Sequence, residues 1–173
     1  MPSFFLKIDL SGYFMSVDRR IVSEKFKKLI QNKYKGKHKE LLLYLTPVIF
    51  ENNPALDCEY KCSEQIRNLV PNRRKMDCNS NYGMAIGNLT AQAGSNLNLN
   101  NFDHYVIEKL KLDKYIRYVD DIIIILDNKK QLIDTLPLIQ NKLAEMHQFI
   151  NKKTKIDTAY HGVPFLGKVS HPY

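Results

Sequence analysis

The sequence predicts an α+β fold in which an antiparallel sheet has helices packed on one face. The apolar run Phe4–Leu10 is typical of a buried strand, and the isoleucine-rich run 121–126 follows an aromatic, β-branched arm, 115–118. Helical periodicity fills most of the chain between these strands and returns after residue 128. The order of elements is therefore strand, helices, hairpin, helix and strand, which predicts one layer of sheet and one of helices.

Residues 115–126 predict a β-hairpin with Val119, Asp120 and Asp121 at its tip. Adjacent carboxylates repel each other unless something neutralises them, and a divalent cation that takes hard oxygen ligands is the obvious agent. The alternative is an ordinary surface turn, since Asp is common in turns. The other residues near the hairpin distinguish a cation site from a surface turn.

The first strand ends in a third acid, Asp9, and pairing of the two central strands brings Asp9 beside Asp120. The turn 11–14 then projects two aromatic side chains close to Asp9. Three acids on one edge can hold two Mg²⁺ or Mn²⁺ ions roughly 3.5–4 Å apart, one activating an attacking hydroxyl and one steadying a leaving phosphate. This is the chemistry of nucleotidyl transfer.

Caps and periodicity predict the helices. Asp18 is an N-cap, a second helix runs from about Glu40 to Phe50, and the glycine-bracketed segment 83–90 leads into a third. Asn128 caps the last helix, whose apolar stripe is Leu132, Leu136, Ile139, Leu143, Met146 and Ile150. A long irregular connection is predicted from Asn52 to Tyr82, one strand from residue 152, and another from residue 162 to the end.

Composition favours a polyanionic partner. The net charge is +8 with a pI near 9.3, and 10 Tyr and 8 Phe offer stacking surfaces, so nucleic acid is favoured over a membrane surface. The basic loop 33–39 is either a phosphate contact or a solvated loop. No apolar run is long enough to span a bilayer and no secretory signal is present, so a cytoplasmic location is expected.

Four motifs, in this order, resemble the palm domain of a reverse transcriptase: Asp9 with Tyr13 and Phe14, residues 86–92, the YVDD motif 118–121, and residues 165–167. The resemblance covers nearly all of residues 1–173. It implies an RRM/ferredoxin-like core and an RNA-directed DNA polymerase that adds dNTPs to a primer 3′-hydroxyl, with an RNA template and a DNA or RNA primer. It also implies fingers before the palm and a thumb after it, both expected to be missing here, which predicts an isolated palm with little or no activity.

The resemblance implies a role for each matching residue. Asp9, Asp120 and Asp121 are the catalytic acids and metal ligands, and Leu10 offers a carbonyl to the metal. Lys153 or Lys155 is the general acid for pyrophosphate, and the choice between them stays open. Residues near the nucleotide are Tyr13, Phe14 (a steric gate against the ribose 2′-hydroxyl), Ile86 and Gly87. Residues near template and primer are Asn88, Gln92, Tyr118, and Phe165, Leu166 and Gly167, which resemble the primer grip.

Residues 86–90, with 69–71 and 162–167, resemble the reverse transcriptases of diversity-generating retroelements. That resemblance implies cDNA synthesis with errors at adenines, a basic accessory protein, and a bacterial or phage origin. Ala85 and Ala91 depart from that group, which usually has Pro and Ser there.

Two alternatives stay open. One is a group II intron, retron or phage-defence reverse transcriptase, and the other is a non-catalytic RNA-binding palm-like module. The three intact acids argue against the second, because loss of catalysis would remove the need to hold them together. Ile86 has two interpretations: it lacks the hydrogen bonds that a Gln would make near the nascent pair, or it is a core contact at a helix entry.

Overall fold

The computed structural model describes residues 3–71 and 80–172. The chain divides into two compact units, one made of residues 1–13 and 100–173 and the other of residues 14–99. No helix among the described residues is long and apolar enough to cross a membrane. Mixed helices and antiparallel strands confirm the predicted α+β class.

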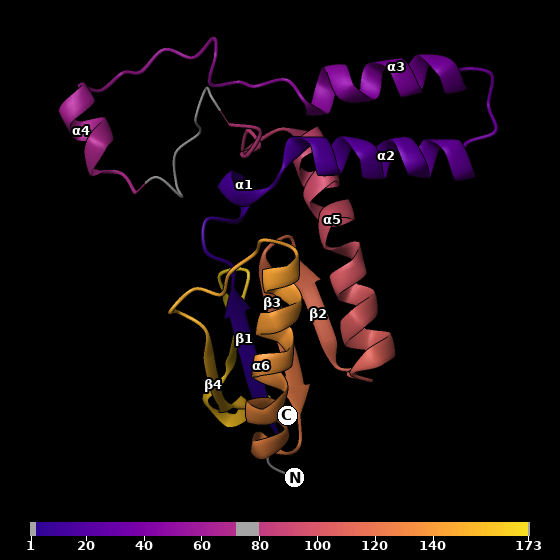
Figure 1. Cartoon of the computed structure of the whole chain (residues 1–173). Helices are drawn as coiled ribbons and strands as arrows, with labels where there is room; N and C mark the ends of the chain where they lie inside the picture. The colour runs from indigo at the N-terminus through magenta and orange to yellow at the C-terminus, as the bar shows by residue number, and fades with distance from the viewer. Residues whose placement is uncertain (1–2, 72–79, 173) are drawn as a thin grey trace. The chain divides into compact units, whose positions relative to one another are not determined.

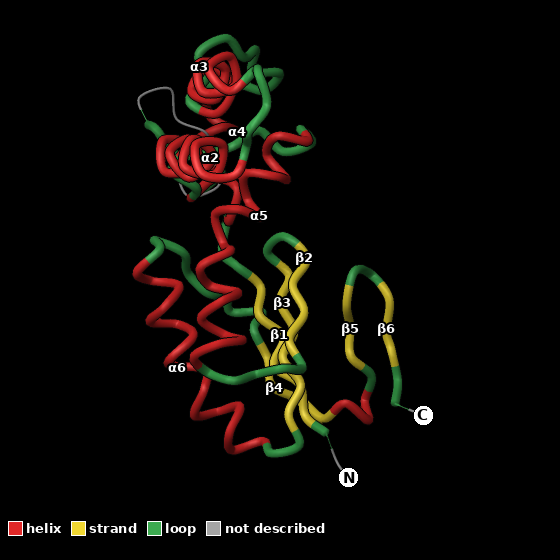
Figure 2. The backbone as a smooth tube through the Cα atoms, turned by 90° about the vertical axis from the view of Figure 1, so that its right-hand side faces the viewer, coloured by secondary structure: helices red, strands yellow, loops and turns green. Residues whose placement is uncertain are grey.

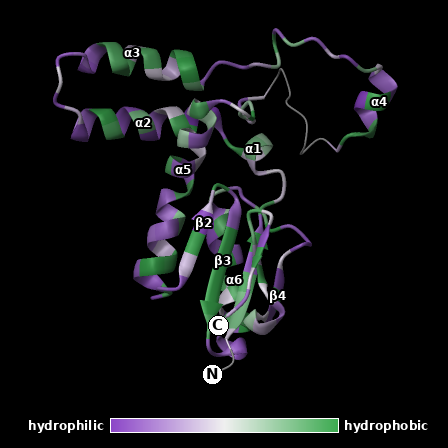
Figure 3. Cartoon of the chain, turned by 180° about the vertical axis from the view of Figure 1, so that it is seen from behind, coloured by the Kyte–Doolittle hydropathy of each residue, from purple (hydrophilic) through white to green (hydrophobic). Residues whose placement is uncertain are grey.

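The first unit is built on a four-stranded sheet in the order β2-β3-β1-β4 (Figure 1). Its strands are β1 (Phe4–Asp9), β2 (Tyr115–Tyr118), β3 (Asp121–Leu126) and β4 (Lys155–Thr158), and all pairings are antiparallel. The predicted central pairing of β1 with β3 is confirmed. β3 is largely hydrophobic along its length, as Figure 3 shows, because a central strand is covered on both faces.

Helix α6 (Lys129–Glu145) covers one face of this sheet, and the other face carries the β5–β6 hairpin (Figure 2). The predicted cap is confirmed, since the Asn128 side chain accepts hydrogen bonds from the backbone N–H groups of Lys130 and Gln131 at 2.9 and 3.3 Å. Within the predicted stripe Leu132, Ile139 and Leu143 are buried. Met146 and Ile150 of that stripe lie beyond the helix end.

The C-terminal strand prediction is wrong in one respect. Residues after 162 form a hairpin of β5 (Val163–Phe165) and β6 (Lys168–Ser170), instead of one strand that continues to the end. The cause is the two-residue turn: Leu166 and Gly167 both have positive φ, 52° and 75°, as a type I′ turn requires. β4 begins at Lys155, later than predicted, because residues 151–154 form a turn closed by a Thr154-to-Asn151 backbone bond.

The second unit contains α2 (Arg19–Lys33), α3 (Lys39–Phe50) and α4 (Glu64–Leu69). Asp18 caps α2 as predicted, accepting from the N–H of Arg20 at 2.9 Å. α3 matches its predicted range with Pro47 inside it. The connection predicted to be irregular contains α4, whose Ser63 cap supplies the local start signal, and residues 72–79 of that connection lie outside the described residues.

Helix α5 (Leu89–His104) continues into a π-helix, η2 (Tyr105–Lys109). Leu99, Phe102 and Val106 lie three and four positions apart and are fully buried. Of the turn predicted at 11–14, residues 11 and 12 form a turn, whereas residues 13 and 14 begin the short helix α1 (Tyr13–Ser16).

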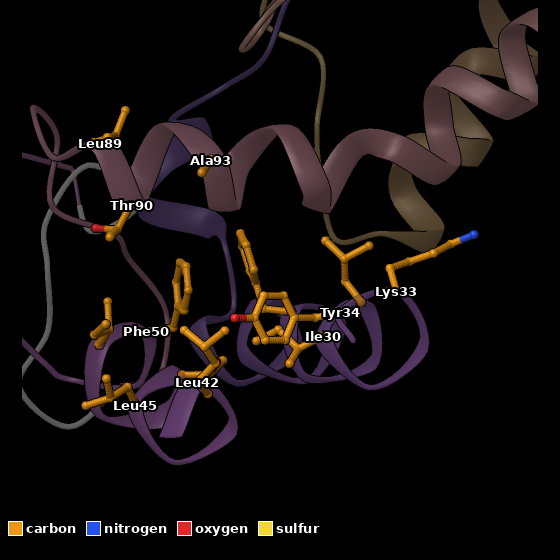
Figure 4. Close-up of a pocket in the computed structure, with 13 residues that line it drawn as sticks. Ile30, Lys33, Tyr34, Leu42, Leu45, Phe50, Leu89, Thr90 and Ala93 are labelled. Atoms are coloured by element: carbon orange, nitrogen blue, oxygen red, sulfur yellow. The ribbon is translucent and has the colours of Figure 1, made fainter. Parts of the chain in front are cut away.

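The second unit has an apolar groove with a volume of about 590 Å³, shown in Figure 4. Leu42, Leu45 and Phe50 of α3 and Ile30 of α2 line it, with Ala93 of α5 on the opposite side. The helical hairpin α2–α3 therefore does not bury all its apolar surface within the unit.

Candidate active site

The register of the central strands brings the predicted carboxylates together. Asp9, the last residue of β1, lies directly opposite Asp121, the first residue of β3. Residues that face each other across an antiparallel pair project from the same face of the sheet. The side chains of Asp9 and Asp121 therefore lie on one face, at the end of the sheet where β1 ends and β3 begins. Asp120 precedes Asp121 in the turn between β2 and β3. The tip of the predicted hairpin is thus Val119 and Asp120, and Asp121 belongs to the strand.

The turn that carries Asp120 is strained. Val119 has a φ of 56°, in the left-handed region that a β-branched residue rarely enters. Such a conformation costs on the order of 1–3 kcal/mol and persists only where the surroundings hold it. Arg117 supplies one restraint, since its Nη1 donates a hydrogen bond to the carbonyl oxygen of Val119 at 3.0 Å.

Arg117 is held in turn by Asp103 of α5. Its Nε and Nη2 donate to the two carboxylate oxygens of Asp103 at 2.7 and 2.5 Å, and the Tyr115 hydroxyl donates to the same carboxylate at 2.5 Å. Burial lowers the pKa of Arg117, but the hydrogen bonds and charge of Asp103 outweigh it and raise that pKa above its ordinary value. Burial and then Asp103 raise the pKa of the Tyr115 hydroxyl. The turn that carries Asp120 is therefore fastened to α5 through the ion pair of Arg117 with Asp103.

The electrostatics of Asp120 reflect the other two acids. Burial raises the pKa of Asp120 above its ordinary value, a hydrogen bond from its own backbone opposes this, and the charges of Asp9 and Asp121 raise it further. Asp120 therefore lies close enough to Asp9 and Asp121 for their negative charges to disfavour its ionised form. A cation placed among the three would relieve it.

Lys7 is a cation that contacts one of these acids, Asp121. Its Nζ lies 3.3 Å from Oδ1 and 3.4 Å from Oδ2 of Asp121, and it donates to the carbonyl oxygen of Pro164 at 3.2 Å. Sequence reasoning missed Lys7, Asp103 and Arg117. A usable signal existed for Lys7, because a charged residue two positions before Asp9 in a strand shares its face.

The predicted metal-binding carbonyl and the two lysines lie at the same end of the sheet. Leu10 forms a bridge with Ile150 whose hydrogen bonds use the carbonyl of Asp9 and the N–H of Ser11, so the Leu10 carbonyl takes no part in them. Lys153 is exposed in the turn beside that bridge. Lys155 lies opposite Lys7 in the β1–β4 register and its Nζ is 3.6 Å from Asp157.

The residues predicted near the nucleotide have different environments. Tyr13 is 2% exposed, which favours packing over contact with a substrate. Phe14 is half-buried, and its carbonyl accepts a backbone hydrogen bond from Met84 at 2.8 Å. Ile86 is 70% exposed, so its interpretation as a core contact is wrong. Gly87 has a φ of 101° and open space around it, and only glycine adopts that conformation readily.

The residues predicted at template and primer are accessible. Asn88 and Gln92 are exposed at the start of α5, and Tyr118 is 56% exposed at the end of β2. Phe165 is half-buried at the end of β5, and Leu166 and Gly167 form the exposed turn of the hairpin.

A comparison with protein families identifies the family to which the chain belongs. The family described as "Reverse transcriptase (RNA-dependent DNA polymerase)" matches residues 2–169. The chain belongs to the reverse transcriptase family. No curated protein gives a match. Membership implies an RNA-directed DNA polymerase, a nucleotidyltransferase that binds an RNA template, a primer and dNTPs.

Reverse transcriptases generally use divalent metal ions such as Mg²⁺, which bind oxygen ligands such as carboxylates. Within residues 3–71 and 80–172, no group of three or more His, Cys, Asp or Glu side chains is arranged so that it could hold a metal ion. The donors still suit Mg²⁺, which binds through one or two carboxylates and completes its shell with water and substrate phosphates. Asp9 and Asp121 face each other, and the negative charges of both raise the pKa of Asp120.

Proposed function

We propose that this chain is the palm of an RNA-directed DNA polymerase that joins dNTPs to a primer 3′-hydroxyl by two-metal nucleotidyl transfer. The succession β1, helices, β2, β3, α6, β4 and the strand order β2-β3-β1-β4 support an RRM/ferredoxin-like core of the palm type. The observation that carries the proposal is the register of Asp9 with Asp121, next to Asp120 in its strained turn.

Asp9 and Asp120 would hold the ions, with Asp121 assisting and the Leu10 carbonyl as a further donor. When bound, the ions would polarise the primer hydroxyl and neutralise charge on the leaving pyrophosphate. The chain's own contribution is orientation: the β1–β3 register fixes two acids, and the bond from Arg117 to Val119 fixes the turn of the third. Fixed donors need no rearrangement during reaction.

The remaining roles follow the family resemblance. Lys153 or Lys155 would donate a proton to the pyrophosphate, and the exposure of both side chains is compatible with that role. Phe14 would exclude a 2′-hydroxyl, and Ile86 and Gly87 would adjoin the incoming nucleotide. Template and primer would be contacted by Asn88, Gln92, Tyr118 and residues 165–167. The basic loop 33–39, which is largely exposed, would contact backbone phosphates.

We assign the enzyme to the diversity-generating type, with error-prone copying at adenines and a basic accessory protein. The exposure of Ile86 supports this assignment, because an exposed apolar side chain beside Gly87 is free to meet a substrate but offers no hydrogen bond. A template and variable repeat pair beside the gene would support it, whereas an intron or retron RNA gene would favour the alternative types.

A Mn²⁺ titration tests the metal site. Asp120→Asn should raise the Kd for Mn²⁺ by about tenfold or more, since it removes a charged ligand that the site requires. Asp134→Asn, a change of the same type at an exposed position of α6, is the control and should leave Kd unchanged. Equal affinity in wild type and Asp120→Asn would remove Asp120 from the site.

A further inference from the structure

Lys7 lies between the carboxylates and the hairpin of residues 163–170. It occupies the same face of β1 as Asp9, two positions away, and its ammonium group meets both oxygens of Asp121 almost equally, at 3.3 and 3.4 Å. The same nitrogen donates to the Pro164 carbonyl of β5 at 3.2 Å. The side chains of Lys7 and Asp121 are only 24% and 23% exposed.

The hairpin needs such a link. β5 and β6 pair with each other as a separate two-stranded sheet, and a hairpin of this size is marginally stable without further contacts. A cavity of about 380 Å³ separates it from the four-stranded sheet, lined by Ile116 and Ile123 on one side and Val163 and Phe165 on the other. Apolar packing across that interface is therefore incomplete, and a directed polar contact gains importance.

We propose that Lys7 is a positioning residue that ties the β5–β6 hairpin to the catalytic carboxylate Asp121. This inference rests on the proposed function in one respect: the hairpin carries the residues that would grip the primer, 165–167. Lys7 then sets the position of the primer terminus relative to the acids, because its ammonium group contacts both Asp121 and the hairpin. Its charge also offsets the negative charge that Asp121 brings to the cluster.

The position of Lys7 has a consequence for cation binding. Its ammonium group faces the carboxylate fork of Asp121, where a metal ion would also approach. Removing the charge should therefore strengthen the binding of a divalent cation, although it loosens the hairpin. A residue that served only to stabilise the fold would have the opposite effect, since a loosened site binds metal less well.

The first experiment measures amide hydrogen exchange in the free chain for Lys7→Met, with Lys114→Met as the control. Lys114 forms an exposed pair with Asp127 at 3.3 Å and lies outside the site. Exchange at residues 165–170 should accelerate about tenfold in Lys7→Met, since a hydrogen bond to a charged donor is lost, and Lys7→Arg should restore most of the protection. Unchanged exchange in the hairpin, or equal acceleration throughout the unit, would overturn the proposal. If Lys7→Met does not fold, Lys7→Gln takes its place under the same criteria.

The second experiment compares ligand affinities. In Lys7→Met the Kd for Mn²⁺ should fall severalfold, and the Kd for a primed RNA should rise about tenfold because the hairpin is no longer fixed. Weaker Mn²⁺ binding together with an unchanged Kd for primed RNA would refute the positioning role. If the wild-type chain binds neither ligand, the proposed function fails, while the exchange result still decides whether Lys7 fixes the hairpin.

Discussion

Removing the Asp103 carboxylate tests how the turn of Val119 and Asp120 is supported. Asp103→Leu would remove the carboxylate that pairs with the Arg117 guanidinium, whose side chain is 9% exposed. Arg117 would lose two hydrogen bonds and Tyr115 its acceptor. Breaking a buried pair by deleting one partner typically costs about 3–5 kcal/mol. Because the Asp103 side chain is 24% exposed, we expect a loss of about 3 kcal/mol, at the lower end of that range.

The double variant separates stability from positioning. Asp103→Leu with Arg117→Leu replaces both charges by apolar groups, so most of the lost stability should return, leaving a net change of about 1 kcal/mol or less. Activity should not return, because the bond from Arg117 to the Val119 carbonyl is missing and the turn at φ 56° is no longer restrained. Urea unfolding followed by far-ultraviolet circular dichroism measures the first quantity, and primer extension by an enzyme that contains this palm and extends primers measures the second. A cost below about 1 kcal/mol for Asp103→Leu, or full activity in the double variant, would refute this reasoning.

Four further predictions concern single residues. Burial, aided by the two neighbouring acids, raises the pKa of Asp120 in the folded state. Ionisation of Asp120 therefore destabilises the fold when the pH is above this raised pKa, and has no such effect when the pH is below the ordinary pKa near 4. Asp120→Asn should therefore raise the Tm in metal-free buffer at pH 7, and the gain should shrink on acidification; a gain that is independent of pH would contradict this. Leu166→Gly should stabilise the hairpin by about 0.5–1 kcal/mol by relieving a positive φ, and a lower Tm would count against strain there. In an enzyme that extends primers, Phe14→Ala should admit ribonucleotides; unchanged sugar selectivity in a folded variant would leave Phe14 a packing residue. Ile86→Gln should leave the Tm unchanged, given 70% exposure, and reduce misincorporation opposite adenine by up to about tenfold; unchanged error frequency with retained activity would remove Ile86 from fidelity.

The sequence by itself determined the features that depend on neighbours along the chain. Side chains at Asp18 and Asn128 cap their helices through bonds to residues two or three positions away, and both were predictable for that reason. The strands of the acidic hairpin were predictable because aromatic and β-branched residues, which favour strands over helices, dominate both of them. Once β1 was expected to pair with the hairpin, the meeting of Asp9 with the other acids followed.

Only the tertiary structure decided which charged groups support those acids. Asp103 and Arg117 resemble ordinary surface charges in the sequence, and for Lys7 the sequence indicates only that it shares a strand face with Asp9. The contact of Lys7 with Asp121 spans 114 residues, and that of Arg117 with Asp103 spans 14. Such contacts depend on strand register and on the placement of a helix against the sheet, neither of which local periodicity specifies. The burial of Tyr13 was likewise decided by tertiary packing, since the sequence around it does not distinguish a buried from an exposed aromatic side chain. The acids could therefore be predicted from sequence, whereas the residues that hold them in place could not.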